Sequence, residues 1–148
     1  MEVTTMARVF DVAHYILNKV GPISTWKLQK LCYYSQAWSL AWTDKPLFEE
    51  DFQAWANGPV CKELWNAHRG KFIVTVDDIQ GDETVLTCEE KETIDSVIES
   101  YGKYESYQLR DLTHSEEPWI NARGNCLDDE YCSTVITKNS MGEYYGSL

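Results

Sequence analysis

The sequence has few basic residues for its size and no long apolar run. Only 13 of its 148 residues are Lys or Arg, against 24 Asp and Glu, so the formal net charge is -11. A chain of this charge repels phosphate backbones, which argues against nonspecific nucleic-acid binding. No apolar run approaches the roughly 18 residues that a membrane-spanning helix needs. The sequence therefore predicts no nucleic-acid partner and no membrane contact.

Motifs for metals, cofactors and secretion are also missing. No CxxC pair, no HExxH and no GxxxxGK[ST] phosphate loop occurs, so we expect no metal and no cofactor. The start of the chain shows no secretory signal, and the number of cysteines is odd, which together favour a reducing cytoplasm. The five cysteines are Cys32, Cys61, Cys88, Cys126 and Cys132.

The apolar content is sufficient for one core. With 148 residues and 43% hydrophobic content, the chain fits one domain that buries roughly 68–70% of its unfolded surface. Apolar residues recur at helical spacing over 9–20, before Gly21-Pro22, and again after Ser24, a plausible N-cap. Thr87 and Glu90 match a capping box for a helix that ends near Gly102.

Shorter helices complete the expected fold. We expect them after Asn57-Gly58-Pro59, with Pro59 at or near the helix start, after Ser106, and from Glu117 to Gly124. The β-branched run 72–76 and the run 84–86, on either side of Gly81-Asp82, suggest a β-hairpin. The predicted fold is therefore mainly α, a compact helical single domain over residues 1–148 with a small β-hairpin insertion. Residues 125–148 are expected to form an acidic loop and a short docking helix.

The second helix carries the main candidate for partner binding. Its aromatic residues cannot share one narrow stripe, so this helix is either central in the fold or exposed at a binding surface. Lysines that border exposed aromatic rings are typical of protein-binding faces, whereas a solvated helix face is the simpler alternative. The candidate contact residues are Trp26, Lys27, Lys30, Tyr33 and Tyr34.

Negative charge is concentrated in the second half of the chain. Residues 1–74 hold 8 basic and 7 acidic side chains, whereas residues 75–148 hold 5 basic and 17 acidic ones. This asymmetry indicates either a solvated acidic surface or a docking face for a basic partner. Asp128, Asp129 and Glu130 form a second candidate partner patch.

One enzyme hypothesis rests on Cys61 and His68. Cys61 lies close to an expected helix start, where a thiolate would be stabilised, and His68 follows one to two turns later. Against catalysis, free cysteine is among the most buried residue types, and a histidine is common at a helix end. We expect no enzyme activity and no catalytic residue.

Several separate pieces of the sequence resemble, together and in order, the signature of the Panacea antitoxin domain, also called the SocA-like or phage-associated GepA-like family. The resemblance covers about residues 6–122 and extends more loosely over the tail. Its pieces are Lys27-Leu28-Gln29-Lys30-Leu31-Cys32-Tyr33-Tyr34-Ser35-Gln36-Ala37-Trp38, Pro46-Leu47-Phe48, Phe52-Gln53-Ala54-Trp55 and Asn57-Gly58-Pro59-Val60.

The resemblance implies a small, mainly helical bacterial or phage protein that binds rather than catalyses. Many members are encoded beside a toxin and neutralise it by direct contact, and one instead delivers its toxin to a protease. An antitoxin with a basic cognate toxin is therefore expected, and a proteolytic adaptor is the alternative. The toxin, the oligomeric state and any autoregulation are not specified. Within the motif, Gly58 and Pro59 should shape a turn, and the residues expected to pack are Leu28, Leu31, Trp38 and Trp55.

Overall fold

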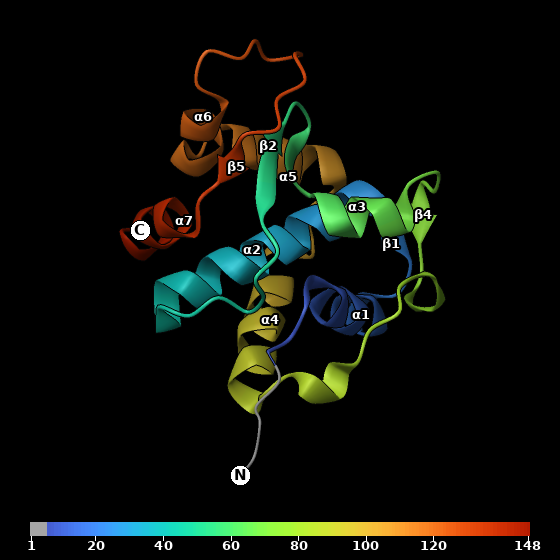
Figure 1. Cartoon of the computed structure of the whole chain (residues 1–148). Coiled ribbons are helices and arrows are strands. Elements are labelled where there is room, and N and C mark those ends of the chain that lie inside the picture. Colours follow the sequence, from blue (N-terminus) through green and yellow to red (C-terminus); the bar gives the residue numbers. More distant parts are fainter. Residues whose placement is uncertain (1–5) are drawn as a thin grey trace.

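The computed structural model describes residues 6–148 of the chain. Within that span, six α-helices and two small sheets surround one long central helix, α2 (Thr25–Thr43) (Figure 1). The predicted mainly α, compact helical fold is confirmed. The surrounding helices are α1 (Val9–Val20), α3 (Lys62–His68), α4 (Cys88–Tyr101), α5 (Ser106–His114), α6 (Glu117–Arg123) and α7 (Lys138–Gly146).

Helix α2 is central: most of its residues are buried, and these include polar side chains such as Gln29, Lys30 and Gln36. Its N-cap is Ser24, as predicted, whose Oγ accepts a hydrogen bond from the Lys27 N–H (3.1 Å). It ends at Asp44, which adopts a left-handed conformation with φ 59°. Helices α1, α4, α5 and α7 and the strand β3 (Gly58–Cys61) all pack against it. A helix covered on so many sides buries residues around most of its circumference, so a narrow apolar stripe is not expected.

The capping signals of two further helices are confirmed. Gly21 follows α1 with φ 79°, a conformation that residues with a side chain rarely adopt. At the start of α4, Thr87 Oγ1 accepts from the Glu90 N–H (3.1 Å), and Glu90 Oε1 accepts from the Thr87 N–H (2.9 Å). This reciprocal pair is the predicted capping box, and it fixes the start of α4.

The predicted hairpin between 72–76 and 84–86 is wrong. Strand β4 (Ile73–Val74) pairs instead with β1 (Ile23–Ser24), and two 3-10 turns follow, η1 (Val76–Asp78) and η2 (Glu83–Val85). Asp82 accounts for the second turn, because its Oδ1 accepts from the Thr84 N–H (2.9 Å). Side-chain bonds of this kind compete with a strand ladder, and a β-branched run does not identify its own partner.

The hairpin of this fold lies earlier in the chain. Strands β2 (Phe52–Trp55) and β3 pair as antiparallel neighbours around the turn that contains Asn57, and Gly58 has φ 110°. The turn is as predicted, but Pro59 lies in β3 rather than at a helix start. Because β5 (Val135–Ile136) occupies the other side of β2, β3 is an edge strand and tolerates a proline.

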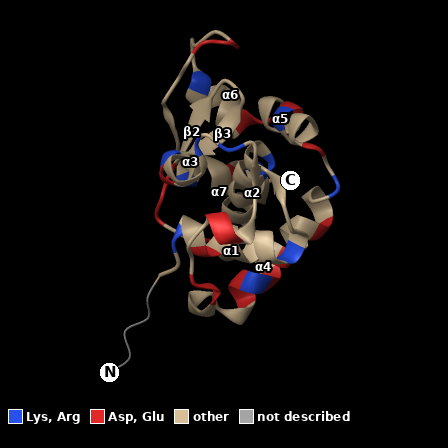
Figure 2. Cartoon of the chain, turned by 90° about the vertical axis from the view of Figure 1, so that its right-hand side faces the viewer, with Lys and Arg blue, Asp and Glu red and all other residues tan. Residues whose placement is uncertain are grey.

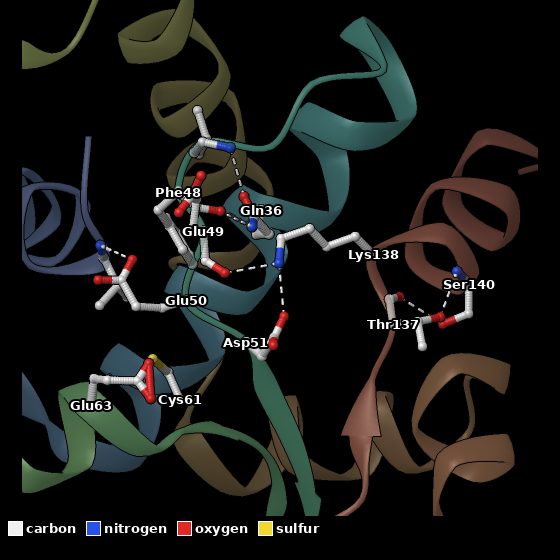
Figure 3. A network of polar contacts seen from close by, with 12 residues as sticks. Gln36, Phe48, Glu49, Glu50, Asp51, Cys61, Glu63, Thr137, Lys138 and Ser140 are labelled. Carbon is white, nitrogen blue, oxygen red and sulfur yellow. Dashed lines mark hydrogen bonds and ion pairs between the residues drawn. The ribbon is translucent and has the colours of Figure 1, made fainter. Parts of the chain in front are cut away.

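Two glutamines of α2 explain why the motif pieces occur together. Gln36 Nε2 donates to the Phe48 carbonyl (2.7 Å), and Gln36 Oε1 accepts from the Leu47 N–H (2.7 Å) (Figure 3). Gln29 does the same for Cys61, accepting from its N–H (2.8 Å) and donating to its carbonyl (3.2 Å). The two buried amides therefore hold the backbone on either side of the hairpin against α2.

The C-terminal helix α7 packs on α2 and is tied to the loop before β2. Thr137 Oγ1 caps it by accepting from the Ser140 N–H (3.1 Å). Lys138 Nζ donates to the Glu49 carbonyl (2.9 Å) and to Asp51 Oδ1 (2.7 Å) (Figure 3). These contacts connect the end of the chain to its centre.

Candidate functional site

The most unusual side chain of the structure is Lys30, whose exposed fraction is 0%. Its Nζ lies 3.5 Å from the Pro59 carbonyl oxygen and 5.4 Å from the centre of the Trp26 ring. No Asp or Glu oxygen of residues 6–148 comes within 4.0 Å of this nitrogen. A buried ammonium normally has a carboxylate partner, because the charge is costly to remove from water.

The environment of Lys30 weakens its hold on a proton. Burial lowers its pKa from 10.5 to about 7, and the positive charge of Arg110 acts in the same direction. Strongly perturbed groups next to a cleft are candidates for functional residues. Lys30 is such a group.

Lys30 lies at an open pocket of about 210 Å³. Three segments that are distant in sequence build it, namely the first turns of α2, the tip of the β2–β3 hairpin and the first turns of α5. Arg110 contributes a second cation, whose only ion pair among the described residues is with the adjacent, exposed Asp111 (3.2 Å). The lining residues are Trp26, Lys30, Asn57, Ser106, Tyr107 and Arg110.

Gly58 allows the lysine to occupy this place. A Cβ at position 58 would lie 2.4 Å from Lys30 Cε, closer than such atoms approach, and 3.1 Å from Thr113 Oγ1, which is a tight contact. Its φ of 110° also disfavours any residue with a side chain. The glycine of the hairpin turn and the lysine of α2 are therefore parts of one structure.

The structure moves three of the five predicted contact residues into the interior. Lys30, Tyr33 and Tyr34 are each 0% exposed, so the prediction that they lie on an exposed face is wrong. The reason is that α2 is central and has no free face at these positions. Trp26 is half-buried and lines the pocket, whereas Lys27 Nζ donates to the Gly102 carbonyl (2.6 Å) and joins α2 to the end of α4.

Tyr33 and Tyr34 belong to a buried network around Glu116, which the sequence did not single out. Glu116 Oε1 accepts from the hydroxyls of Tyr34 (2.7 Å) and Tyr145 (2.8 Å), and the Tyr145 oxygen lies 3.2 Å from that of Tyr33. Burial raises the pKa of Glu116, and the two hydroxyl bonds oppose that rise. The network joins α2, α7 and the start of α6.

The packing residues of the motif behave largely as expected. Leu28 and Leu31 are fully buried. Trp38 is half-buried, and its Nε1 donates to the Tyr101 hydroxyl (2.8 Å). Trp55 is also half-buried and packs edge-on against Trp65, with the ring centres 5.5 Å apart.

The second predicted patch lies away from the pocket. Asp128, Asp129 and Glu130 are exposed in the loop between α6 and β5, and none of them lines the pocket. Glu130 Oε2 accepts from the Leu127 N–H (2.9 Å), which closes a turn. Arg123 anchors the loop by donating to the Ala54 carbonyl of β2 (3.0 Å).

The geometry removes the basis of the cysteine-enzyme hypothesis. Burial raises the pKa of the Cys61 thiol to about 12, so the thiolate is not formed near neutral pH. The ring of His68 contacts Gln29 (2.9 Å between the two Nε2 atoms), and burial lowers the pKa of His68. Within residues 6–148, no group of three His, Cys, Asp or Glu side chains could hold a metal ion.

Comparison with models of known protein families shows which family this chain belongs to. The family model described as antitoxin SocA-like, Panacea domain, matches residues 28–120, which is more than half of the chain. The chain belongs to this family. The Panacea match begins in α2 and ends in α6, and it includes Lys30, Gly58 and Arg110.

Two broader searches add no relatives. A search of curated proteins and a search of solved structures each found no significant match. In the part of the chain that the structure describes, no helix combines the length and apolar character needed to cross a membrane. The assignment to the Panacea family therefore rests on the family model and on the motif pieces that the structure brings together.

Proposed function

We propose that the protein is an antitoxin that neutralises a protein toxin by direct contact. The observation that carries this proposal is the Panacea family match over residues 28–120. The buried, protonated state of Cys61 supports binding rather than nucleophilic chemistry. The cognate toxin is expected to be the product of an adjacent gene.

The exposed rim of the pocket has the composition of a protein-binding centre. Tyr107 is 58% exposed, Arg110 is exposed and Trp26 is half-buried. Trp, Tyr and Arg are the residue types that dominate binding hot spots, which cluster around pockets rather than on flat surfaces. This rim is therefore the favoured place for toxin contact.

The acidic surface favours a basic toxin. Helix α4 carries several of the acidic residues, which appear as red segments of its ribbon in Figure 2. A negative surface raises the association rate of a positively charged partner, and salt screens that attraction. The acidic residues of α4 are Glu89, Glu90, Glu92, Asp95 and Glu99.

The decisive experiment expresses the adjacent open reading frame in a bacterial host, with and without this protein. The antitoxin proposal predicts that the neighbour stops growth alone, that this protein restores growth, and that the two co-purify. Rescue with protease-dependent loss of the toxin would instead establish the adaptor alternative. No toxicity and no complex would contradict both.

The purified pair separates the two mechanisms further. An inhibitor should block the toxin with no third component, whereas an adaptor should act only when the protease is added. For the inhibitor, the association rate should fall as ionic strength rises. An association rate that is the same at low and high salt would contradict electrostatic steering.

A further inference from the structure

We propose that the pocket at Lys30 binds a carboxylate side chain, an Asp or Glu that the toxin inserts between Trp26 and Arg110. This inference rests on the proposed antitoxin function and names the chemistry of its central contact. It joins three observations, namely a buried lysine without an acidic partner, an open pocket whose wall this lysine helps to form beneath the exposed rim, and a second cation on the pocket lining.

The first step concerns the charge of Lys30. Its one hydrogen bond, to the Pro59 carbonyl, spans 3.5 Å and is at the limit of such contacts. An ammonium has three donors, so most of its hydrogen-bonding capacity is unused within the described chain. A carboxylate in the pocket would supply both the missing charge and the missing acceptors.

The second step concerns the other groups around the pocket. Arg110 presents a planar guanidinium that suits a carboxylate, and its present partner Asp111 is exposed and adjacent in sequence. Exposed ion pairs of this kind contribute little to stability, so Arg110 can exchange Asp111 for an incoming carboxylate at a small cost in free energy. Trp26 and Tyr107 add apolar surface that would exclude water from the new pair.

The third step distinguishes a protein side chain from a nucleotide. The pocket volume is about 210 Å³, below the roughly 300–1,000 Å³ that is usual for small-molecule sites. The formal net charge of -11 also opposes the approach of a polyphosphate. A single carboxylate carries one negative charge and fits the available space.

The test titrates the protein with sodium acetate, the simplest carboxylate, and follows the Trp26 indole N–H by NMR. Sodium chloride at equal ionic strength and inorganic phosphate are titrated in parallel. We expect a saturable shift with acetate, at concentrations on the order of millimolar for so small a ligand, and none with chloride. Equal shifts with acetate and chloride, or tighter binding of phosphate than of acetate, would overturn the proposal.

Variants locate the binding. Lys30→Met should abolish the acetate shift, and Arg110→Gln should weaken acetate binding by about tenfold. Arg69→Gln is the matched control, because Arg69 is an exposed arginine near a tryptophan ring, 5.7 Å from the centre of Trp65, outside the pocket. Arg110 is exposed, so its substitution tests the site even if Lys30→Met fails to fold. Undiminished binding in Arg110→Gln would count against the site.

Failure of this inference is distinguishable from failure of the proposed function. The acetate titration needs no toxin, whereas growth rescue needs no knowledge of the pocket. If rescue succeeds and Arg110→Gln neutralises the toxin as well as Arg69→Gln does, the antitoxin function stands and the carboxylate site is wrong. If Arg110→Gln alone loses neutralisation, both proposals are supported.

Discussion

Two buried ionisable groups packed against α2, Glu116 and Lys30, have very different surroundings. Glu116 receives hydrogen bonds from two tyrosine hydroxyls, at 2.7 and 2.8 Å, and does not line the pocket at Lys30. Lys30 has one long contact with a backbone carbonyl and lies at an open pocket. The first arrangement satisfies its charged group internally, whereas the second leaves the charge for a ligand to satisfy.

Neighbouring residues of one short motif on α2 contribute either to stability or to binding. Lys30 and Tyr34 lie one helical turn apart on α2, yet the lysine faces the hairpin tip and α5 while the tyrosine faces Glu116. Residues that a family signature groups together therefore serve different purposes. The Glu116 network should be sensitive to any loss of a partner, and the Lys30 pocket should tolerate loss of its charge.

The largest loss of stability is expected on substitution of Glu116, whose carboxylate accepts hydrogen bonds from within the fold. Glu116→Ala leaves the hydroxyls of Tyr34 and Tyr145 without their acceptor, so the free energy of unfolding should fall by about 3 kcal/mol. Urea denaturation at pH 7 measures the change. Glu116→Gln keeps an acceptor oxygen and should lose less than Glu116→Ala; equal losses in the two variants would show that the hydroxyl bonds contribute nothing.

The second largest loss of stability is expected on substitution of Gly58, where the β2–β3 hairpin approaches Lys30 closely. Gly58→Ala places a Cβ 2.4 Å from Lys30 Cε in a backbone with φ 110°, and should lower the free energy of unfolding by about 2 kcal/mol. Gly21→Ala is the control, because Gly21 also has positive φ (79°) but nothing lies within 4 Å of its added Cβ. A control that loses as much as Gly58→Ala would attribute the loss to backbone strain alone.

Removal of the Lys30 charge should raise the free energy of unfolding rather than lower it. Lys30→Met keeps the length of the side chain and removes a buried ammonium without a carboxylate partner. We expect the free energy of unfolding to rise by about 1–2 kcal/mol at pH 7, while the acetate response is lost. Thermal or urea unfolding measures the first and NMR the second. A variant that is clearly less stable than the wild type would identify Lys30 as a structural residue.

The stability gain of Lys30→Met should shrink as pH rises. The folded-state pKa of Lys30 is lowered to about 7 from 10.5, so between these values the unfolded chain binds more protons and wild-type stability rises with pH. The charged group that acts on the pKa of Lys30 is Arg110 on α5, and the charge of Lys30 in turn lowers the pKa of His114 on the same helix. Urea midpoints of wild type and Lys30→Met at pH 7 and pH 9.5 check this, and a constant difference between them would contradict it.

Local signals in the sequence predicted the helices well and the long-range pairings poorly. Ser24, Gly21 and the Thr87-Glu90 box each act within a few residues, so the sequence alone was enough to place these helix ends. The hairpin was placed wrongly because β4 pairs with Ser24 and Ile23, about 50 positions earlier, and no local pattern encodes that choice.

The candidate site was predicted only in part, for a related reason. Trp26 and Lys30 were chosen because aromatic and basic residues adjoin on one helix, and both are in the pocket. Their expected exposure was wrong for Lys30, because burial depends on what packs over α2. Tyr107 and Arg110 come from α5, about 80 positions away, and only the tertiary fold brings them to the pocket.

The most direct test of the central claim is the pKa of Lys30 itself, measured from the carbon-13 shift of its Cε in free and acetate-saturated protein. A lysine that lacks a carboxylate partner and gains one on binding should titrate with a pKa of about 7 when free and at a higher pH with acetate bound. A pKa near 10.5 in the free protein, or one that acetate does not change, would contradict the claim that Lys30 is a carboxylate-binding residue.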